Sequence, residues 1–326
     1  MATSVSQRTG LIPFLKATAV EALDTHNYST FLVPQYCIGS VPNGGYVASC
    51  ILRAALLHLA PRGQSDTIAA HFEYINRSEV GAALMVVEDV KIGRAISVIQ
   101  VTLYQSDLQP AAPWMTPHSR REVVAFITNT RISLERGLTL ETGWSMIPPP
   151  PAVNFTKLVR GDDANWAARP KSTSGRANNY ARVHENLEFY APRQGQVRRG
   201  VEDSWIRLTS GERFSNVALG FVADAFPYVV EAWRPGADEK QVPFGHNEMF
   251  WYPTLALNMD VKKALPAEGA EWLFIRCSTK VIHQGRLDLE ILILDEATEL
   301  VAISSHVALI LPAERNLGAR SHTKKL

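Results

Sequence analysis

The stretch PNGGYVASCILRAALLHLAPRG, at Pro42–Gly63, carries the clearest helix signal in the chain. Its apolar residues recur with a helical period from Gly45 to about Leu59, and the turn formers at 60–63 end the pattern. Asn43 precedes this segment and is a residue type that caps helix N-termini. We therefore expect a helix that spans roughly Gly45 to Leu59.

Strand-like segments follow this helix. Apolar and polar residues alternate through Thr67–Ile75, Ala83–Val90, Ala95–Leu103 and Val123–Ile127. A Gly-containing turn at 91–94 joins the second segment to the third, which is typical of a β-hairpin. This part of the chain predicts one long helix followed by a run of antiparallel strands.

The same order of elements recurs roughly 175 to 190 positions later. A helix is expected from about Val217 to Trp233, kinked at Pro227, and strands are expected at 254–261, 272–282, 287–294 and 300–304. A tandem duplication of one α+β unit explains this repetition better than two unrelated domains. Wrapping each sheet around its helix would bury the apolar face of the helix, and pairing the units edge to edge would remove exposed sheet edges.

A polar segment separates the two units. It begins near Gly143, contains four consecutive prolines at 148–151, and lacks sustained periodicity as far as Asn186. We therefore predict an N-terminal unit at 1–142, a linker at 143–186 and a C-terminal unit at 187–326.

Composition restricts the partners. The chain has 326 residues, 46% of them hydrophobic, and 33 Lys and Arg against 32 Asp and Glu, a formal net charge of +1. This near-neutral balance argues against a nucleic-acid partner and favours a small or apolar one. No metal-ligand spacing among the histidines and no dinucleotide or phosphate-binding fingerprint is found, so neither a metal nor another cofactor is expected.

The same features predict a location. The cysteines Cys37, Cys50 and Cys277 are odd in number and far apart, which argues against a disulfide framework and favours a reducing compartment. Neither a signal peptide nor a membrane span is predicted, so we expect a soluble, cytoplasmic protein. The C-terminal Lys324-Lys325-Leu326 is close to the Ser-Lys-Leu peroxisomal address and leaves a peroxisomal location open.

Several motifs, in their order and spacing, resemble those of the type II acyl-CoA thioesterases. The motifs are the turn Pro42–Tyr46, the strand end Asn76–Ser78, the turn Gly93-Arg94, the strand Ser204–Arg207, the helix residues Ala223-Asp224, a Thr-Leu strand at Thr254 and the last strand Leu300–Ser304. The resemblance covers nearly the whole chain apart from the linker and the termini. It implies a double hot dog fold, in which two helix-in-sheet units are joined in one chain.

The resemblance also implies an activity and a site. Members of the family hydrolyse acyl-CoA thioesters, and an Asp, a Thr and a Gln hold the attacking water. These positions correspond here to Asp224, Thr254 and His306, so a histidine replaces the Gln. A Gln can only orient a water, whereas a histidine near its ordinary pKa can also take its proton. The flanking apolar helix favours a raised pKa for Asp224.

Further candidates come from the first unit and from a loop. The turn Gly44-Gly45-Tyr46 is a candidate for substrate binding, because the amides of a helix N-terminus are suited to a developing oxyanion. Arg198 and Arg199 could contact the phosphates of CoA. Aligning the two halves places Ser49, Thr67 and Asn129 opposite Asp224, Thr254 and His306, which indicates one active and one vestigial cleft.

Three functions are compatible with this sequence. The first is hydrolysis of an acyl thioester, carried by CoA or by a protein, with the acyl tail in an apolar tunnel between sheet and helix. The second uses Asp224 and His306 as an acid–base pair for dehydration, cyclisation or isomerisation of a polyketide-like substrate. The third is acyl binding without catalysis. A homo-oligomer is left open.

Overall fold

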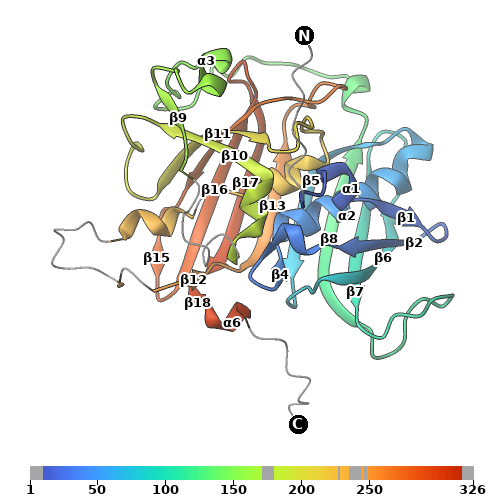
Figure 1. Ribbon diagram of the computed structural model, residues 1–326. Helices are drawn as coiled ribbons and strands as arrows, with labels where there is room; N and C mark the ends of the chain where they lie inside the picture. The colour runs from blue at the N-terminus through green and yellow to red at the C-terminus, as the bar shows by residue number, and fades with distance from the viewer. Residues whose placement is uncertain (1–9, 171–179, 227, 235–243, 246–247, 318–326) are drawn as a thin grey trace.

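The computed structural model describes residues 10–170, 180–226, 228–234, 244–245 and 248–317. One antiparallel sheet of 14 strands passes through both halves, with the first-half strands on one side and the second-half strands on the other (Figure 1). From edge to edge the strands are β1 (Val20–Ala22), β2 (Asn27–Leu32), β6 (Gly81–Lys91), β7 (Ser97–Gln105), β8 (Arg120–Thr130), β5 (Asp66–Tyr74), β13 (Thr254–Val261), β17 (Leu300–Leu309), β16 (Arg286–Leu294), β14 (Leu273–Ser278), β11 (Val201–Leu208), β10 (Leu187–Pro192) and β9 (Trp166–Ala168), with β15 (Ile282–His283) beside β16.

The two halves join through β5 and β13. These strands pair antiparallel from Ala256 opposite Glu73 to Asp260 opposite Ala69. Both β5 and β13 therefore have a strand on each side, and neither half leaves an exposed sheet edge where the halves meet. This arrangement confirms the edge-to-edge pairing and the double hot dog architecture that the sequence predicted.

The first-half helix α2 (Gly44–Leu59) has the predicted position. The Asn43 side chain accepts a hydrogen bond from the Tyr46 amide at 3.0 Å and so caps the N-terminus. Most side chains of α2 are buried, because the helix lies within the curve of the sheet and packs on it.

The other helices and pairs are short. They are α1 (Phe14–Ala17), α3 (Phe155–Arg160), α5 (Ala218–Val222), α6 (Glu314–Leu317), the 3-10 turns at Pro34–Tyr36, Ala60–Arg62, Ile132–Leu134, Arg182–Asn186 and Val229–Trp233, and the two-stranded pairs β3 (Cys37–Ile38) with β4 (Val41–Pro42) and β12 (Phe250–Trp251) with β18 (Leu311–Pro312). Within the described ranges, no helix combines the length and the apolar character that a membrane crossing requires.

The predicted long helix of the second half, from Val217 to Trp233, is wrong. The α-helix α5 ends at Val222, and a separate 3-10 turn follows at 229–233. The predicted kink at Pro227 lies outside the described residues. Proline has no amide hydrogen with which to continue a helix, and Asp224, just after α5, is held by groups of the first half instead.

Small residues let α5 approach α2 closely. Ser49 Oγ donates a hydrogen bond to the Val217 carbonyl at 2.8 Å and accepts one from the Phe221 amide at 2.9 Å. A Cβ atom on Gly45 would lie only 2.5 Å from the Gly220 carbonyl oxygen. The contact between the two helices therefore requires glycine at position 45, and it brings Asp224 to the N-terminus of α2.

The segment at 143–186, predicted as a linker without elements, contains α3 and β9 in its described part. Leu158 and Trp166 are fully buried against Trp205 and Phe274 in a second hydrophobic cluster on the outside of the sheet. These apolar residues are too widely spaced for a periodic pattern, so no element is predicted here from the sequence. The division of the chain at 142 and 187 stays a proposal.

Candidate functional site

Asp224 is held at the N-terminus of α2 by groups from the other half of the chain. Its Oδ2 accepts hydrogen bonds from the Gly45 amide at 2.8 Å and from Asn43 Nδ2 at 2.9 Å. The positive end of the helix dipole stabilises a carboxylate at this position. A Cβ on Gly44 would lie 3.0 Å from Oδ2, so glycine there leaves room for the carboxylate.

The other carboxylate oxygen faces the remaining two predicted residues. Thr254 Oγ1, at the start of β13, donates a hydrogen bond to Asp224 Oδ1 at 3.0 Å. His306 Nδ1, on the neighbouring β17, lies 3.7 Å from the same oxygen. The structure thus brings Asp224, Thr254 and His306 together.

Burial raises the pKa of Asp224 to about 6. Hydrogen bonds from Gly45, Thr254 and Asn43 favour the carboxylate and limit this rise. A carboxyl group with a pKa near 6 is mostly ionised at neutral pH and accepts a proton more readily than an ordinary aspartate. This electrostatic setting suits a general base.

His306 is fully buried, and its hydrogen bonds define its tautomer. Ser304 Oγ donates its hydrogen to the Asn258 carbonyl at 2.7 Å, so it can only accept from His306 Nε2, 3.0 Å away. Nδ1 therefore carries the lone pair, and it has no hydrogen-bond partner among the residues that the structure describes.

Burial also changes what His306 can do. It lowers the pKa of His306 to about 3, so the ring is neutral at physiological pH. This differs from the sequence-based expectation of a histidine near its ordinary pKa. A neutral ring accepts a hydrogen bond at Nδ1 without taking up a second proton there, and in this respect Nδ1 resembles the carbonyl oxygen of a Gln.

A cavity of about 260 Å³ opens beside Asp224 and Thr254. Its walls are mostly apolar and come from both halves of the chain. The apolar side chains include Ile38, Val41, Val47 and Ile75 of the first half and Phe226, Val229, Val230, Trp251, Leu255, Leu287, Leu289, Leu309 and Leu311 of the second. Asn43, Gly44 and Tyr74 add polar atoms near Asp224, whereas His306 is not in the wall and reaches the site beside Asp224.

Tyr228 is a polar residue of this cavity that the sequence did not single out. Its hydroxyl is buried and has no hydrogen-bond partner within the described part of the chain. Burial raises the pKa of Tyr228 well above its ordinary value, so the hydroxyl keeps its proton and can donate it in a hydrogen bond. In the apolar stretch around position 228 a tyrosine is indistinguishable from a core residue.

The turn at Gly44-Gly45-Tyr46 has a different role from the predicted one. The amides of Gly45 and Tyr46 donate to Asp224 and Asn43, so they hold the carboxylate and the cap rather than an oxyanion. Tyr46 does not reach the cavity, because its buried ring stacks on Tyr36 at 4.8 Å and its hydroxyl donates to the Ala17 carbonyl at 2.7 Å. Gly44 does line the cavity.

The two candidate arginines differ in their surroundings. Arg198 lines a second cavity of about 430 Å³, together with Lys280 and several apolar side chains. Val230 lies in the walls of both cavities, so they are neighbours. Arg199 is in neither wall.

The first half has no equivalent constellation at the predicted positions. Thr67 Oγ1 donates to Asn129 Oδ1 at 2.8 Å, and Ser49 is bonded to α5. Both Thr67 and Thr254 are followed by a bulge, and the registers beyond it pair Ala70 with Ile127 and Leu257 with His306. The counterpart of His306 is therefore Ile127, and its predicted match to Asn129 is wrong.

Comparison with known families agrees with this architecture. The acyl-CoA thioesterase N-terminal domain matches residues 32–128, and the acyl-CoA thioesterase C-terminal domain matches residues 158–310. These two matches span most of the chain. The protein therefore belongs to the acyl-CoA thioesterase family, as the motifs predicted.

Individual proteins are similar over nearly their full length. The thioesterase-like protein TwmA of Talaromyces wortmannii is 41% identical over 335 residues, which cover 96% of each chain. The solved acyl-CoA thioesterase II TesB2 of Mycobacterium marinum is 15% identical with a TM-score of 0.58, over 93% of this chain and 100% of its own. A conserved hot dog protein of Alicyclobacillus acidocaldarius is 14% identical with a TM-score of 0.68, over 91% and 97%. The structural likenesses confirm the fold.

Proposed function

We propose that this protein hydrolyses an acyl-CoA or a related acyl thioester. The observation that carries the proposal is the position of Asp224. This carboxylate is buried at a helix N-terminus, bonded by Thr254, next to the unpaired His306 Nδ1 and at the edge of an apolar cavity. A base beside an apolar cavity matches a substrate that has a hydrophobic tail and a carbonyl to be attacked.

In this mechanism, Asp224 Oδ1 takes a proton from a water as the water oxygen attacks the thioester carbonyl carbon. Thr254 positions that oxygen of the carboxylate. The tetrahedral intermediate collapses by breaking the C–S bond, and the departing thiolate recovers the proton from Asp224. The products are the free acid and the thiol, and the enzyme returns to its starting state.

His306 acts as a positioning residue rather than as the base. Asp224 Oδ1 and His306 Nδ1 are two acceptors 3.7 Å apart. One hydrogen-bond donor between them satisfies both, whether it is the attacking water or the protonated Asp224 that follows proton transfer. Because the ring stays neutral, this arrangement also supports hydrolysis over the alternative in which Asp224 and His306 form an acid–base pair.

Tyr228 is our candidate for stabilising the oxyanion. Its buried hydroxyl lines the cavity and is free to donate, whereas the first amides of α2 are bonded to Asp224 and Asn43. The acyl chain would lie along the leucines of the cavity. Arg198 and Lys280, in the neighbouring cavity, would supply positive charge for the phosphates of a CoA carrier, and Arg199 receives no role.

The test is release of thiol from a panel of acyl-CoAs, with the product identified by mass spectrometry. We expect the free acid, formed by gain of water and loss of CoA, and a loss of about 10²- to 10⁴-fold in Asp224→Asn. Glu73→Gln, an exposed carboxylate change on β5, is the control and should leave the rate unchanged. An isomerised or dehydrated product would support the lyase alternative. Binding that is indifferent to Asp224→Asn, without turnover, would support the acyl-binding alternative.

A further inference from the structure

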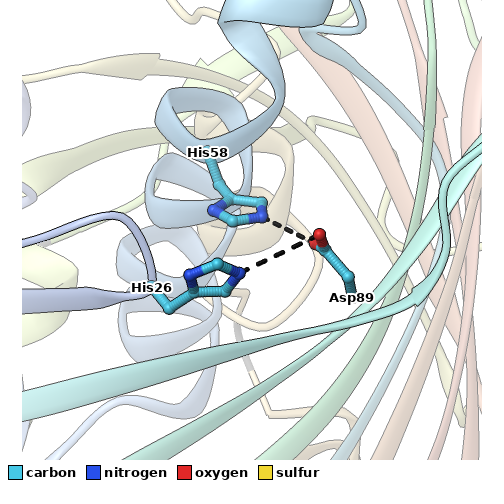
Figure 2. Close-up of side chains that lie close together, drawn as sticks. All are labelled: His26, His58 and Asp89. Atoms are coloured by element: carbon cyan, nitrogen blue, oxygen red, sulfur yellow. Dashed lines mark hydrogen bonds and ion pairs between the residues drawn. The ribbon is translucent and has the colours of Figure 1, made fainter.

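A second group of polar side chains lies at the opposite end of α2. His58 belongs to the last turn of α2, His26 lies in the turn between β1 and β2, and Asp89 is on β6. Figure 2 shows both imidazole rings directed at the Asp89 carboxylate. His58 Nε2 is 2.8 Å from Asp89 Oδ1, His26 Nε2 is 3.9 Å from Oδ2, and the ligand atoms of the three residues all lie within 4.8 Å of one another.

The hydrogen bonds of His58 allow its Nε2 to bind either a metal ion or the Asp89 carboxylate directly. Nδ1 lies 3.1 Å from the Thr25 carbonyl oxygen, to which it can donate, and 3.1 Å from the Tyr28 hydroxyl, from which it can accept. When Nδ1 donates to Thr25, Nε2 presents a lone pair toward Asp89 Oδ1, 2.8 Å away, and a metal ion bound by both atoms satisfies the pair. When Nδ1 accepts from Tyr28, Nε2 donates its hydrogen to Asp89 instead.

The surroundings suit a metal ion, because a second histidine is directed at the same carboxylate. Nδ1–H bonded to a backbone carbonyl is the arrangement that orients metal-bound histidines. His26 is oriented in a similar way, with Nδ1 2.9 Å from Thr25 Oγ1. Its loop is fixed by Asp24, whose Oδ1 accepts from the amides of His26 and Asn27, each at 2.8 Å. The two histidines thus present Nε2 to Asp89 from a rigid frame.

From these observations we infer that His26, His58 and Asp89 form a binding site for a divalent transition-metal ion, with Zn²⁺ as the best match. Two imidazoles and one carboxylate are the ligand types of zinc, and bonds of about 2.0–2.1 Å in a tetrahedron place ligand atoms roughly 3.3–3.5 Å apart. The separations of 2.8 Å and 3.9 Å need only small rotations to reach this value. The His26 ring and the Asp89 carboxylate are partly exposed, whereas His58 is largely buried, and the exposed side leaves the fourth position to water.

The site is separate from the proposed reaction centre and does not depend on it. The fourteen steps along the helix from Gly44 to His58 correspond to about 21 Å. The C-terminal end of a helix favours a cation just as the N-terminal end favours the Asp224 carboxylate, so each end of α2 holds a charge of the matching sign. A bound ion would connect the β1–β2 turn, α2 and β6, and would stabilise the first half.

The experiment is titration of the chelator-treated, full-length protein with zinc chloride, followed by calorimetry and by thermal unfolding. We expect one Zn²⁺ per chain and a Tm that rises by about 3 °C or more at saturating Zn²⁺. His26→Ala and Asp89→Asn should each weaken binding by at least about tenfold. His26 is an informative position because its side chain is 45% exposed, so its removal does not depend on a change in the core.

The matched control is His71→Ala. His71 lies 3.2 Å from Glu73 on an exposed part of β5, where no second histidine completes a metal-binding group within the described ranges. This variant should bind Zn²⁺ like the wild type. The cysteines Cys37, Cys50 and Cys277 are buried and do not compete. Absence of saturable binding, or binding that persists unchanged in both His26→Ala and Asp89→Asn, would overturn the proposal and leave His58 and Asp89 as a hydrogen-bonded pair.

Discussion

The two halves of the molecule share one plan but differ where the helix meets the sheet. The first half keeps a full helix of 16 residues, and the second half has an α-helix of only 5. In the first half, Thr67 donates a hydrogen bond to Asn129. In the second half, the equivalent Thr254 donates to Asp224 at the edge of a cavity. The buried Ile127 of the first half corresponds to His306.

This difference shows how a duplicated fold can build one site from two copies. The intact first-half helix supplies its N-terminus, with Asn43 and Gly45 bonded to the carboxylate. The shortened second-half helix frees Asp224 to turn toward that end. Thr254 and His306 come from neighbouring strands of the second half. Neither half contains all of these groups, so we expect substitutions in the two halves to differ in their effects on the rate and on stability.

The largest contrast is expected between two tyrosines of the cavity. Tyr228→Phe removes the unpaired hydroxyl and should lower kcat by about 10²- to 10³-fold with little change in KM, because an oxyanion donor acts mainly in the transition state. Tyr74→Phe removes a hydroxyl that is already bonded to the Gly44 carbonyl at 2.8 Å. It should cost about 1 kcal/mol of stability and leave kcat within about threefold. Equal effects on kcat in steady-state assays would remove Tyr228 from the mechanism.

The contact between the halves is tested by Gly45→Ala. A methyl group there would lie 2.5 Å from the Gly220 carbonyl oxygen and 2.7 Å from Asp224 Cβ, so the helices must separate. We expect a loss of about 3 kcal/mol in the free energy of unfolding, measured with urea, together with reduced hydrolysis. Gly137→Ala, where no atom lies within 4 Å of the added carbon, should stay within about 0.5 kcal/mol of the wild type. Similar stabilities for the two variants would mean that α2 and α5 are not in such close contact.

A smaller contrast is expected between the two equivalent threonines. Thr254→Val removes the hydrogen bond to Asp224 Oδ1 and should reduce kcat/KM by about tenfold, since one neutral hydrogen bond that positions the base contributes on the order of 1.4 kcal/mol. Thr67→Val breaks only the bond to Asn129 and should lower stability by about 1 kcal/mol without affecting the rate. If Thr67→Val also slowed hydrolysis, the region around Thr67 in the first half would take part in the reaction.

Much of the fold could be predicted because its signals are local. The bounds of α2 follow from an uninterrupted helical period and the Asn43 cap, and the long strands follow from alternation on either side of turns. The length of α5 could not be predicted in this way. Its apolar run continues beyond Val222, but the helix ends where Asp224 is drawn to α2, and that contact joins positions 179 residues apart.

The site was predictable only as far as the family resemblance reached. Asp224, Thr254 and His306 were found through matching motifs, whereas the protonation of His306 depends on burial that the sequence does not show. The roles of Tyr46 and Tyr228 cannot be predicted, because the sequence does not reveal which tyrosine faces the core and which the cavity. The match of His306 to Asn129 failed because alternation along a strand repeats every two residues, so it also allows an alignment that is two residues out of register. His26, His58 and Asp89 come from three elements and form no sequence motif.

The most direct test of the account is the pH dependence of kcat/KM in the wild type and in His306→Gln. Asp224 must be ionised to take the proton, and its pKa is about 6, so kcat/KM should fall about tenfold per pH unit below pH 6. Since His306 is already neutral above about pH 3, we predict that His306→Gln retains activity within about tenfold and keeps the same midpoint near pH 6. Loss of activity at every pH in His306→Gln, or disappearance of the acidic limb, would show that the histidine is the base and would contradict the assignment of Asp224.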